Sequence, residues 1–294
     1  MNVNDYSLWT AVVTPFLENG AVDYKSLEVL LHDQENAGNG IVILGSTGEA
    51  LNLEAEEKKE ILKFTLSLKL KVPLMAGVGG INLRETKDWV TYLETLSLQA
   101  YLLVTPLYAK PGKFGQYEWF KALLDISTRP CMLYNVPGRT AASLNFEAVT
   151  MLKDHPRFWA IKEASGSPFD FKRYKECAPK ASMYSGDDAM TPVFASFGAK
   201  GLVSVASNVW PKETKEYVRQ SLAQTLVDSE LWKECSDSLF IASNPVPVKA
   251  LLHHLGKIKT NLMRAPLDHR DLKDLKPVLT AHESIVGWYK DQVK

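Results

Sequence analysis

The sequence predicts an α/β protein, a (β/α)8 barrel with a C-terminal helical extension. Short runs of apolar and β-branched residues recur along roughly the first 210 residues, and stretches with helical patterns separate them. Most of the runs are continuously apolar, as in parallel strands that are covered on both faces. The eight runs are 8–13, 40–44, 73–78, 100–105, 131–136, 158–162, 182–185 and 201–205.

The spacing of these runs supports an alternation of strands and helices. Their starts lie about 20–33 residues apart, which is the length of a strand, a loop and a helix. The stretch 54–71 carries acidic residues first and basic residues later, as the helix dipole favours. Eight such units indicate a TIM barrel, which typically takes ~250 residues. A doubly wound open sheet is the main alternative. However, the segment Gly77-Val78-Gly79-Gly80 lacks the glycine spacing of a dinucleotide-binding fold.

Beyond residue 205 the sequence predicts helices alone. Helical patterns cover 212–227, 229–241, 246–255 and 268–289, and prolines at 245, 247 and 266 interrupt them. The last helix of the barrel itself falls within 212–227. We therefore expect a catalytic barrel over residues 1–225 and a helical extension over residues 226–294 that packs on it.

The composition excludes several classes of protein. Lys plus Arg and Asp plus Glu number 34 each, so no net charge favours nucleic acid as a partner. No apolar run reaches the ~20 residues of a membrane span, and the first residues lack the pattern of a secretory signal. The 3 cysteines and 6 histidines form no disulfide framework and no metal-binding motif. We expect a cytoplasmic protein with no nucleic-acid or membrane partner and no metal.

One lysine stands at the end of a predicted buried strand. Lys162 follows the apolar run Phe158-Trp159-Ala160-Ile161, where an amine is costly to bury unless it is paired, solvated or neutral. Burial favours the neutral amine, which is the form that attacks a carbonyl to make a Schiff base. For a single strand-end lysine, extension to solvent is the alternative. The other residues at the same face of the barrel favour the chemical role.

Polar residues gather where the predicted strands end. The carboxyl ends of all strands of such a barrel meet at one face, where the active site lies. Turn formation explains any one of these segments, but five at one face favour a functional site. The segments are Gly45-Ser46-Thr47-Gly48-Glu49, Thr105-Pro106-Leu107-Tyr108, Tyr134-Asn135-Val136-Pro137-Gly138-Arg139-Thr140, Lys162-Glu163 and Ser185-Gly186-Asp187-Asp188.

The hydroxyl groups at this face suit the proton transfers of Schiff-base chemistry. Tyr134 lies on the strand beside Lys162, and its phenol can serve the carbinolamine oxygen as an acid and a base. The hydroxyls of Ser46, Thr47 and Tyr108 suit a relay from that phenol to solvent.

Two further features suit an anionic substrate. The glycine loop at 45–48 can turn backbone N–H groups toward an anion, and the Arg139 guanidinium matches a carboxylate in two hydrogen bonds. Structural alternatives remain open for both. Ser46 with Glu49 three positions later fits a helix-capping box, and Arg139 fits a surface ion pair. Asp187-Asp188 is read as a strand-end turn in preference to a magnesium site.

These motifs resemble the dihydrodipicolinate synthase family of pyruvate-dependent lyases and aldolases, and the resemblance covers nearly the whole chain. The motifs that carry it are the glycine loop, the Tyr134 segment with Arg139, Ile161-Lys162-Glu163-Ala164, Ser185-Gly186-Asp187-Asp188 and Asn244-Pro245-Val246-Pro247-Val248-Lys249. The resemblance implies condensation of pyruvate with aspartate-4-semialdehyde, which opens the diaminopimelate route to lysine. It also implies no organic cofactor, no catalytic metal and a homo-oligomer, either a dimer or a dimer of dimers.

The resemblance further implies a role for each candidate residue. The catalytic residues are Lys162, which forms the Schiff base with pyruvate, Tyr134, the general acid and base, and its hydroxyl partners Ser46 and Tyr108, the latter from a neighbouring subunit. The substrate-binding residues are Thr47 for the pyruvate carboxylate, Arg139 for the carboxylate of aspartate-4-semialdehyde, and Gly186 and Val203, which line the pocket through backbone groups.

Two departures from the family pattern bear on the substrate. The family usually carries threonine at the position of Ser46, and the Gly-Ser-Thr-Gly-Glu form is associated with N-acetylneuraminate lyases. Cleavage of a sialic acid or of a 2-keto-3-deoxy sugar acid is therefore the alternative reaction. Arg139 and Glu163 favour the synthase, since those lyases usually lack both. A third alternative, a barrel that only senses a keto acid, needs neither Lys162 nor Tyr134.

A last departure bears on regulation. Lysine-inhibited members carry polar or histidine side chains after the glycine loop and a tyrosine before the Tyr108 position. Here Leu51, Ala55 and Lys58 follow the loop, and Leu107 precedes Tyr108. Since leucine and alanine cannot bind the ammonium and carboxylate groups of lysine, we expect weak or absent feedback by lysine.

Overall fold

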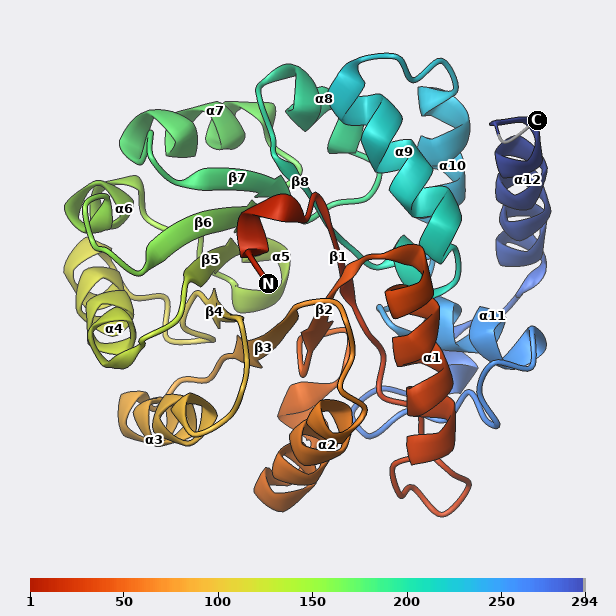
Figure 1. Cartoon of the computed structure of the whole chain (residues 1–294), viewed down its shortest axis with the longest axis horizontal. Helices are drawn as coiled ribbons and strands as arrows, with labels where there is room; N and C mark the ends of the chain where they lie inside the picture. The colour runs from red at the N-terminus through yellow and green to blue at the C-terminus, as the bar shows by residue number, and fades with distance from the viewer. Residues whose placement is uncertain (293–294) are drawn as a thin grey trace.

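The chain forms a closed barrel of eight parallel strands that follow one another in chain order (Figure 1). The computed structural model describes residues 1–292. The predicted (β/α)8 fold is confirmed, and every predicted run forms a strand whose ends agree to within two residues. The strands are β1 (Leu8–Ala11), β2 (Gly40–Ile43), β3 (Leu74–Val78), β4 (Ala100–Val104), β5 (Cys131–Asn135), β6 (Phe158–Glu163), β7 (Ser182–Ser185) and β8 (Gly201–Ser204).

Helices surround the barrel and then continue into the extension. Around the barrel lie α1 (Tyr24–Ala37), α2 (Ala55–Ser67), α3 (Leu83–Glu94), α4 (Lys113–Ile126), α5 (Pro137–Thr140), α6 (Phe146–Leu152), α7 (Pro168–Cys177), α8 (Thr191–Ser196) and α9 (Pro211–Ala223). The extension holds α10 (Ser229–Ser238), α11 (Val246–His254) and α12 (Lys276–Gln292). The described residues also form the short 3₁₀ helices η1 (Val3–Asp5), η2 (Ala50–Asn52), η3 (Ala206–Asn208) and η4 (His269–Asp271).

Two predicted helices differ most from the structure at one end. The helix predicted over 268–289 begins only at Lys276, because Pro277 lacks the N–H that a helix interior needs and fits the first turn. Asp268 instead caps η4 by accepting a hydrogen bond from the N–H of Arg270. The helix predicted over 54–71 ends at Ser67, since Lys69 takes a left-handed φ of 52°.

Apolar residues fill both faces of the barrel wall, which explains the continuously apolar strands. One cluster lies inside the barrel and includes Trp9, Met75, Tyr134, Tyr184 and Val203. A larger cluster lies between the strands and the surrounding helices. Because both faces are covered, the polar side chains of the strands collect at their ends.

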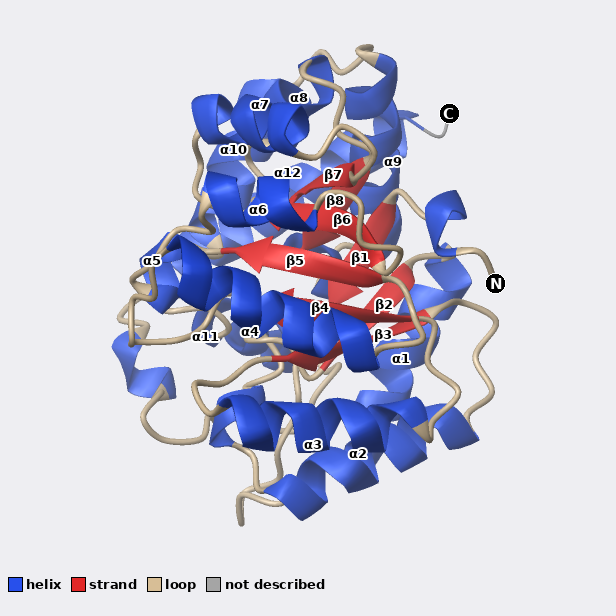
Figure 2. Ribbon diagram, turned by 90° about the vertical axis from the view of Figure 1, so that its left-hand side faces the viewer, coloured by secondary structure: helices blue, strands red, loops and turns tan. Residues whose placement is uncertain are grey.

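The N-terminal segment covers the amino end of the barrel. Val3 belongs to the interior cluster, and the indole N–H of Trp159 donates to the Asn4 side chain at 2.8 Å. Figure 2 shows the N-terminus on the right and α5, which follows the carboxyl end of β5, on the left. The carboxyl end of the barrel is therefore the end that the N-terminal segment leaves open.

The extension shares its core with the barrel helices. The Trp232 ring of α10 stacks on Tyr217 of α9 at a centroid distance of 4.2 Å, and Trp288 of α12 meets Trp232 edge-on at 5.1 Å. In Figure 1, α10 and α12 lie side by side beyond α9, and α11 contacts α12. The boundary at residues 225 and 226 remains a prediction. No helix within residues 1–292 combines the length and the apolar character of a membrane span.

Candidate active site

Lys162 and Tyr134 meet inside the barrel near its carboxyl end. The two residues are register partners on β6 and β5, so their side chains lie on the same face of the sheet. The Lys162 amine lies 4.1 Å from the centre of the Tyr134 ring, and only 5% of Lys162 and 6% of Tyr134 is exposed. The sequence placed both residues at the barrel mouth, and the structure brings them into contact.

Gly186 leaves the room that the Lys162 side chain occupies. A Cβ atom at position 186 would lie 2.8 Å from Cε and 2.9 Å from Cγ of Lys162. Neither carbon can yield without moving the lysine. The Gly186 N–H also donates to the carbonyl of Glu163 at 2.6 Å, which joins the ends of β7 and β6. Glycine at this position is thus matched to the buried lysine.

The glycine loop follows β2 and presents backbone donors. The N–H groups of Ser46, Thr47 and Gly48 donate to no acceptor in the part of the chain that the structure describes. Thr47 is 2% exposed and Ser46 is half-buried. The Thr14 hydroxyl donates to the Gly48 carbonyl at 2.7 Å and so fixes the loop against the end of β1. Three consecutive N–H groups without an acceptor suit the binding of an anion.

The capping box predicted for Ser46 and Glu49 is wrong. Glu49 does not reach back to Ser46, because its carboxylate is buried against Lys249 instead. A capping box does form further along the chain, where Glu54 and Glu57 cap the start of α2. Ser46 is therefore left without a helix-capping role.

Asn244 joins the two predicted anion-binding elements. Its side-chain NH2 group donates to the Thr47 hydroxyl at 2.9 Å, and its backbone carbonyl accepts from the Arg139 guanidinium at 3.1 Å. Because the Thr47 oxygen accepts this hydrogen bond, its own proton must point elsewhere. Arg139 itself is exposed on α5. Sequence reasoning used Asn244 only as part of a motif and missed its contacts.

Of the remaining predicted site residues, Tyr108 lies on the surface and Val203 lies inside the barrel. Tyr108 is 87% exposed, has a left-handed φ of 61°, and shares no hydrogen bond with Tyr134 or Ser46 within residues 1–292. The structure of one chain does not bring these three hydroxyls together. Val203 is fully buried one residue before the end of β8, in the cluster that contains Tyr134.

Two buried carboxylates brace the strand ends from outside the barrel. Glu163 accepts hydrogen bonds from Asn135 at 2.7 Å and from the N–H of Ser165 at 2.6 Å, and burial raises its pKa. Asp188 accepts from the Ser204 hydroxyl and from the N–H of Val205, and burial raises its pKa to about 6. Asp188 thus ties β7 to β8. Within residues 1–292 no group of acidic, histidine or cysteine side chains could hold a metal ion.

A buried ion pair is the feature that sequence reasoning missed most clearly. The Lys249 amine lies 2.6 Å from the Glu49 carboxylate, and both side chains are fully buried. Lys249 is the one charge in the apolar run 246–252, which is the same kind of signal that marked Lys162. The pair connects the glycine loop to α11.

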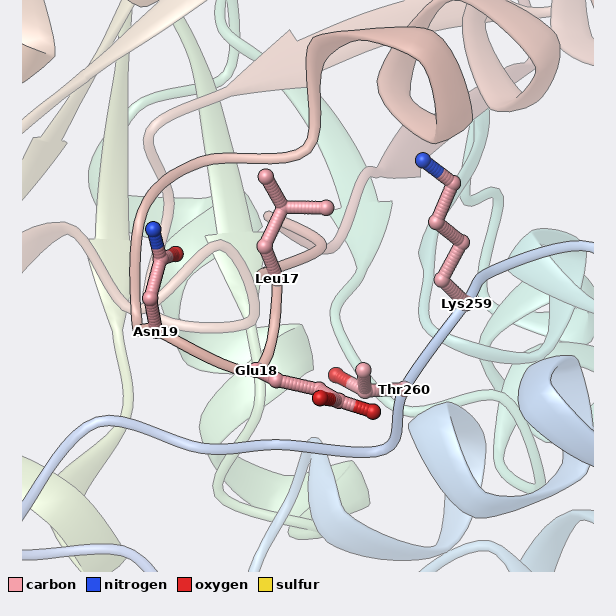
Figure 3. Close-up of a pocket in the computed structure, with 5 residues that line it drawn as sticks. All are labelled: Leu17, Glu18, Asn19, Lys259 and Thr260. Atoms are coloured by element: carbon pink, nitrogen blue, oxygen red, sulfur yellow. The ribbon is translucent and has the colours of Figure 1, made fainter.

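A surface hollow of about 350 Å³ lies elsewhere. Figure 3 shows its lining, formed by the loop 17–19 and by Lys259 and Thr260. None of the predicted site residues lines it. The chemical groups at the barrel mouth therefore identify the site better than the size of this hollow does.

The fold and the site define the class of the protein: a Schiff-base-forming lyase built on a TIM barrel. The chain belongs to the dihydrodipicolinate synthetase family, whose model matches residues 6–281.

Individual relatives agree with this membership. The 4-hydroxy-tetrahydrodipicolinate synthase of Francisella philomiragia is 49% identical over 284 residues, which cover 96% of each chain. The chloride inhibited dihydrodipicolinate synthase of Acinetobacter baumannii, solved in complex with pyruvate, superposes with a TM-score of 0.90 at 33% identity and covers 95% of this chain and 98% of that one. The enzyme of Cyanidioschyzon merolae, solved with lysine bound, gives a TM-score of 0.89 at 30% identity, with 96% and 98% covered.

Proposed function

We propose that the protein catalyses the 4-hydroxy-tetrahydrodipicolinate synthase reaction, in which pyruvate condenses with L-aspartate-4-semialdehyde through a Schiff base on Lys162. The observation that carries the proposal is the buried Lys162 amine, 4.1 Å from the Tyr134 ring. The relatives that are 44–49% identical are named for the product of this reaction, which supports the choice of substrates.

The first half of the reaction uses Lys162 and Tyr134. The Lys162 nitrogen attacks C2 of pyruvate, and the oxygen of C2 leaves as water after Tyr134 passes a proton to it. Loss of a proton from C3 turns the resulting imine into an enamine. The enamine carbon then attacks the aldehyde carbon of the second substrate, whose amino group finally replaces Lys162 at C2 and closes the ring.

The two substrates are held by separate groups. Thr47 and the free N–H groups of the glycine loop bind the pyruvate carboxylate, while Arg139 binds the carboxylate of aspartate-4-semialdehyde. Backbone groups of Gly186 and Val203 line the space between them. The Asn244 hydrogen bonds to Thr47 and Arg139 support this division, since one residue sets the distance between both binders.

The active unit is a homo-oligomer, a dimer or a dimer of dimers, in the cytoplasm. Tyr108 from a neighbouring subunit completes the hydroxyl relay from Tyr134 through Ser46. In support, Tyr108 and Ile81 are both large and exposed. The hydrogen bond from the Leu107 N–H to the Gly80 carbonyl at 3.2 Å places them on adjacent loops. An exposed apolar patch of this kind favours a protein partner.

Feedback by lysine is weak or absent in this protein. The apolar side chains of Leu51 and Leu107 offer no group that binds an ammonium or a carboxylate. A steady-state assay with added lysine measures this directly. Inhibition at lysine concentrations below about 1 mM, the upper end of the usual range of KM values, would contradict the proposal.

Two assays test the proposed function. Borohydride reduction in the presence of pyruvate should leave a covalent adduct on Lys162, and its absence would exclude any Schiff-base enzyme. Coupled turnover with aspartate-4-semialdehyde should exceed cleavage of N-acetylneuraminate or of a 2-keto-3-deoxy sugar acid. The reverse order would favour the aldolase alternative, which the serine at position 46 suggests.

A further inference from the structure

We propose that the buried Glu49–Lys249 pair is a positioning device through which the C-terminal extension holds the glycine loop, so that these two residues set the affinity for pyruvate without touching it. The inference rests on the proposed function, which assigns the loop to the pyruvate carboxylate. Glu49 is the residue directly after the loop, and Lys249 lies on α11, 200 residues further along the chain.

Both oxygens of the Glu49 carboxylate are bound by the extension. Oε1 accepts from the Lys249 amine at 2.6 Å, and Oε2 accepts from the backbone N–H of Arg264 at 2.9 Å. The Lys249 amine also donates to the Leu262 carbonyl at 2.8 Å. Since both side chains are fully buried, no water competes for these contacts. The carboxylate can therefore take only one position relative to the extension.

The loop needs such an anchor because its backbone is strained at both ends. Leu44 and Glu49, which flank the loop, have left-handed φ values of 59° and 54°. For residues other than glycine this conformation costs roughly 1–2 kcal/mol each and persists only where the surroundings enforce it. A Cβ at Gly77 would lie 2.1 Å from the Leu44 carbonyl oxygen, so β3 supports the first end by close approach. The Glu49–Lys249 pair supports the second.

The anchor is itself fixed to the barrel. The Arg264 guanidinium binds the Glu57 carboxylate at 2.6 and 2.7 Å and the Gly20 carbonyl at 2.7 Å. Four residues earlier in the chain, the hydroxyl of Thr260, which lines the hollow in Figure 3, donates to the Phe16 carbonyl at 2.8 Å. The segment that holds Glu49 is thus joined to α2 and to the loop after β1.

The energetics of the pair favour a positioning role over a stabilising one. Burial lowers the pKa of Lys249 to about 8 even though the adjacent Glu49 carboxylate raises it. The cost of desolvating the ammonium group therefore exceeds what the ion pair gains. Replacing a buried ion pair by uncharged residues of similar size is often neutral for stability. What an ion pair adds over apolar packing is a fixed direction for each group, and the group it directs here ends the substrate loop.

The double variant Glu49→Gln with Lys249→Met tests the proposal, because it removes both charges and keeps both volumes. We expect it to fold and to form the borohydride adduct at saturating pyruvate. Its KM for pyruvate should rise by about tenfold, the weight of one charge-assisted hydrogen bond, with a smaller change in kcat and in the KM for aspartate-4-semialdehyde. Glu49→Gln alone should give an intermediate rise in the same constant.

A matched control neutralises another ion pair between the extension and the barrel. Lys257 and Asp33 are 2.8 Å apart and partly exposed, and they do not contact the loop. Asp33→Asn with Lys257→Met should leave every kinetic constant unchanged.

Three results would overturn the inference. They are an unchanged KM for pyruvate in the double variant, a uniform loss of kcat and of both affinities, and failure of the double variant to fold, which would make the pair a requirement of the barrel. Absence of an adduct in the wild-type protein would instead refute the proposed function.

Discussion

Two buried lysines of the same protein show how differently one side chain can be used. Lys162 is 5% exposed, lies against the Tyr134 ring and makes no ion pair or hydrogen bond with any described residue. Lys249 is fully buried, and its amine is held by Glu49 and by the Leu262 carbonyl. Both follow apolar residues in the sequence. The partner, and not the burial, separates an amine that fixes a neighbouring segment from an amine that is free for chemistry.

The glycine loop links the Lys249 side to the proposed binding site for pyruvate. Its Ser46 and Thr47 belong to the proposed substrate side, and Glu49 belongs to the side of Lys249. If the comparison is correct, changes on the Lys162 side should act on chemistry and changes on the Lys249 side should act on stability and affinity.

The largest effect is expected at Lys162. Lys162→Ala removes the nucleophile, so the borohydride adduct should disappear and turnover should fall by a factor of about 10⁴ or more. Mass spectrometry of the reduced protein measures the adduct. Lys257→Met, which removes an exposed lysine, is the control and should form the adduct normally. An adduct on Lys249 in the Lys162→Ala variant would show that the paired amine is also reactive, and would contradict the distinction between the two lysines.

The next effect is expected at Tyr134. Tyr134→Phe keeps the ring against the Lys162 side chain but removes the hydroxyl, so kcat should fall by about 10² to 10⁴ while some adduct still forms. Steady-state kinetics together with borohydride trapping separate the two steps. Wild-type turnover in this variant would refute the proton-transfer role and leave Tyr134 as a packing partner alone.

The sequence predicted the fold well because the signals of the fold are local and repeated. Each buried strand is a continuous apolar run, and eight of them at regular spacing define a closed barrel. The sequence also placed Lys162 and Tyr134 at one face, since strand ends of a parallel barrel must converge. The start of the helix predicted over 268–289 was placed too early, because the pattern of apolar residues continues through the proline at 277.

The contacts of Glu49, Lys249 and Asn244 were out of reach for a different reason. Lys249 lies 200 positions from Glu49, and Asn244 lies 197 positions from Thr47. No periodic pattern specifies which carboxylate a buried amine meets. Glu49 was assigned instead to a capping box with Ser46, because that motif can be recognised within four residues. The burial of a lysine can be read locally, whereas its partner depends on the tertiary fold.

On the Lys249 side, the expected effect is on stability. Lys249→Met alone leaves the Glu49 carboxylate buried without its partner, so the free energy of unfolding should fall by about 3–5 kcal/mol. Urea unfolding followed by circular dichroism measures this. Lys257→Met, which breaks the exposed pair with Asp33, should lose no more than about 1 kcal/mol. Equal losses in the two variants would mean that burial does not distinguish the pairs.

The smallest effect is expected at Ser46, the half-buried residue of the loop whose side chain makes no hydrogen bond with the described residues. In the variant Ser46→Thr the added methyl group restricts χ1, so the hydroxyl should be better ordered for proton transfer. Because the Glu49 end already fixes the backbone, only this rotamer remains to be ordered, and kcat should rise by about two- to threefold, or ~0.5 kcal/mol. Ser46→Ala, which lacks the hydroxyl, should lower kcat in the same assay. A gain above tenfold would show that the loop is not held by Glu49, since the added methyl group would then be ordering the backbone as well.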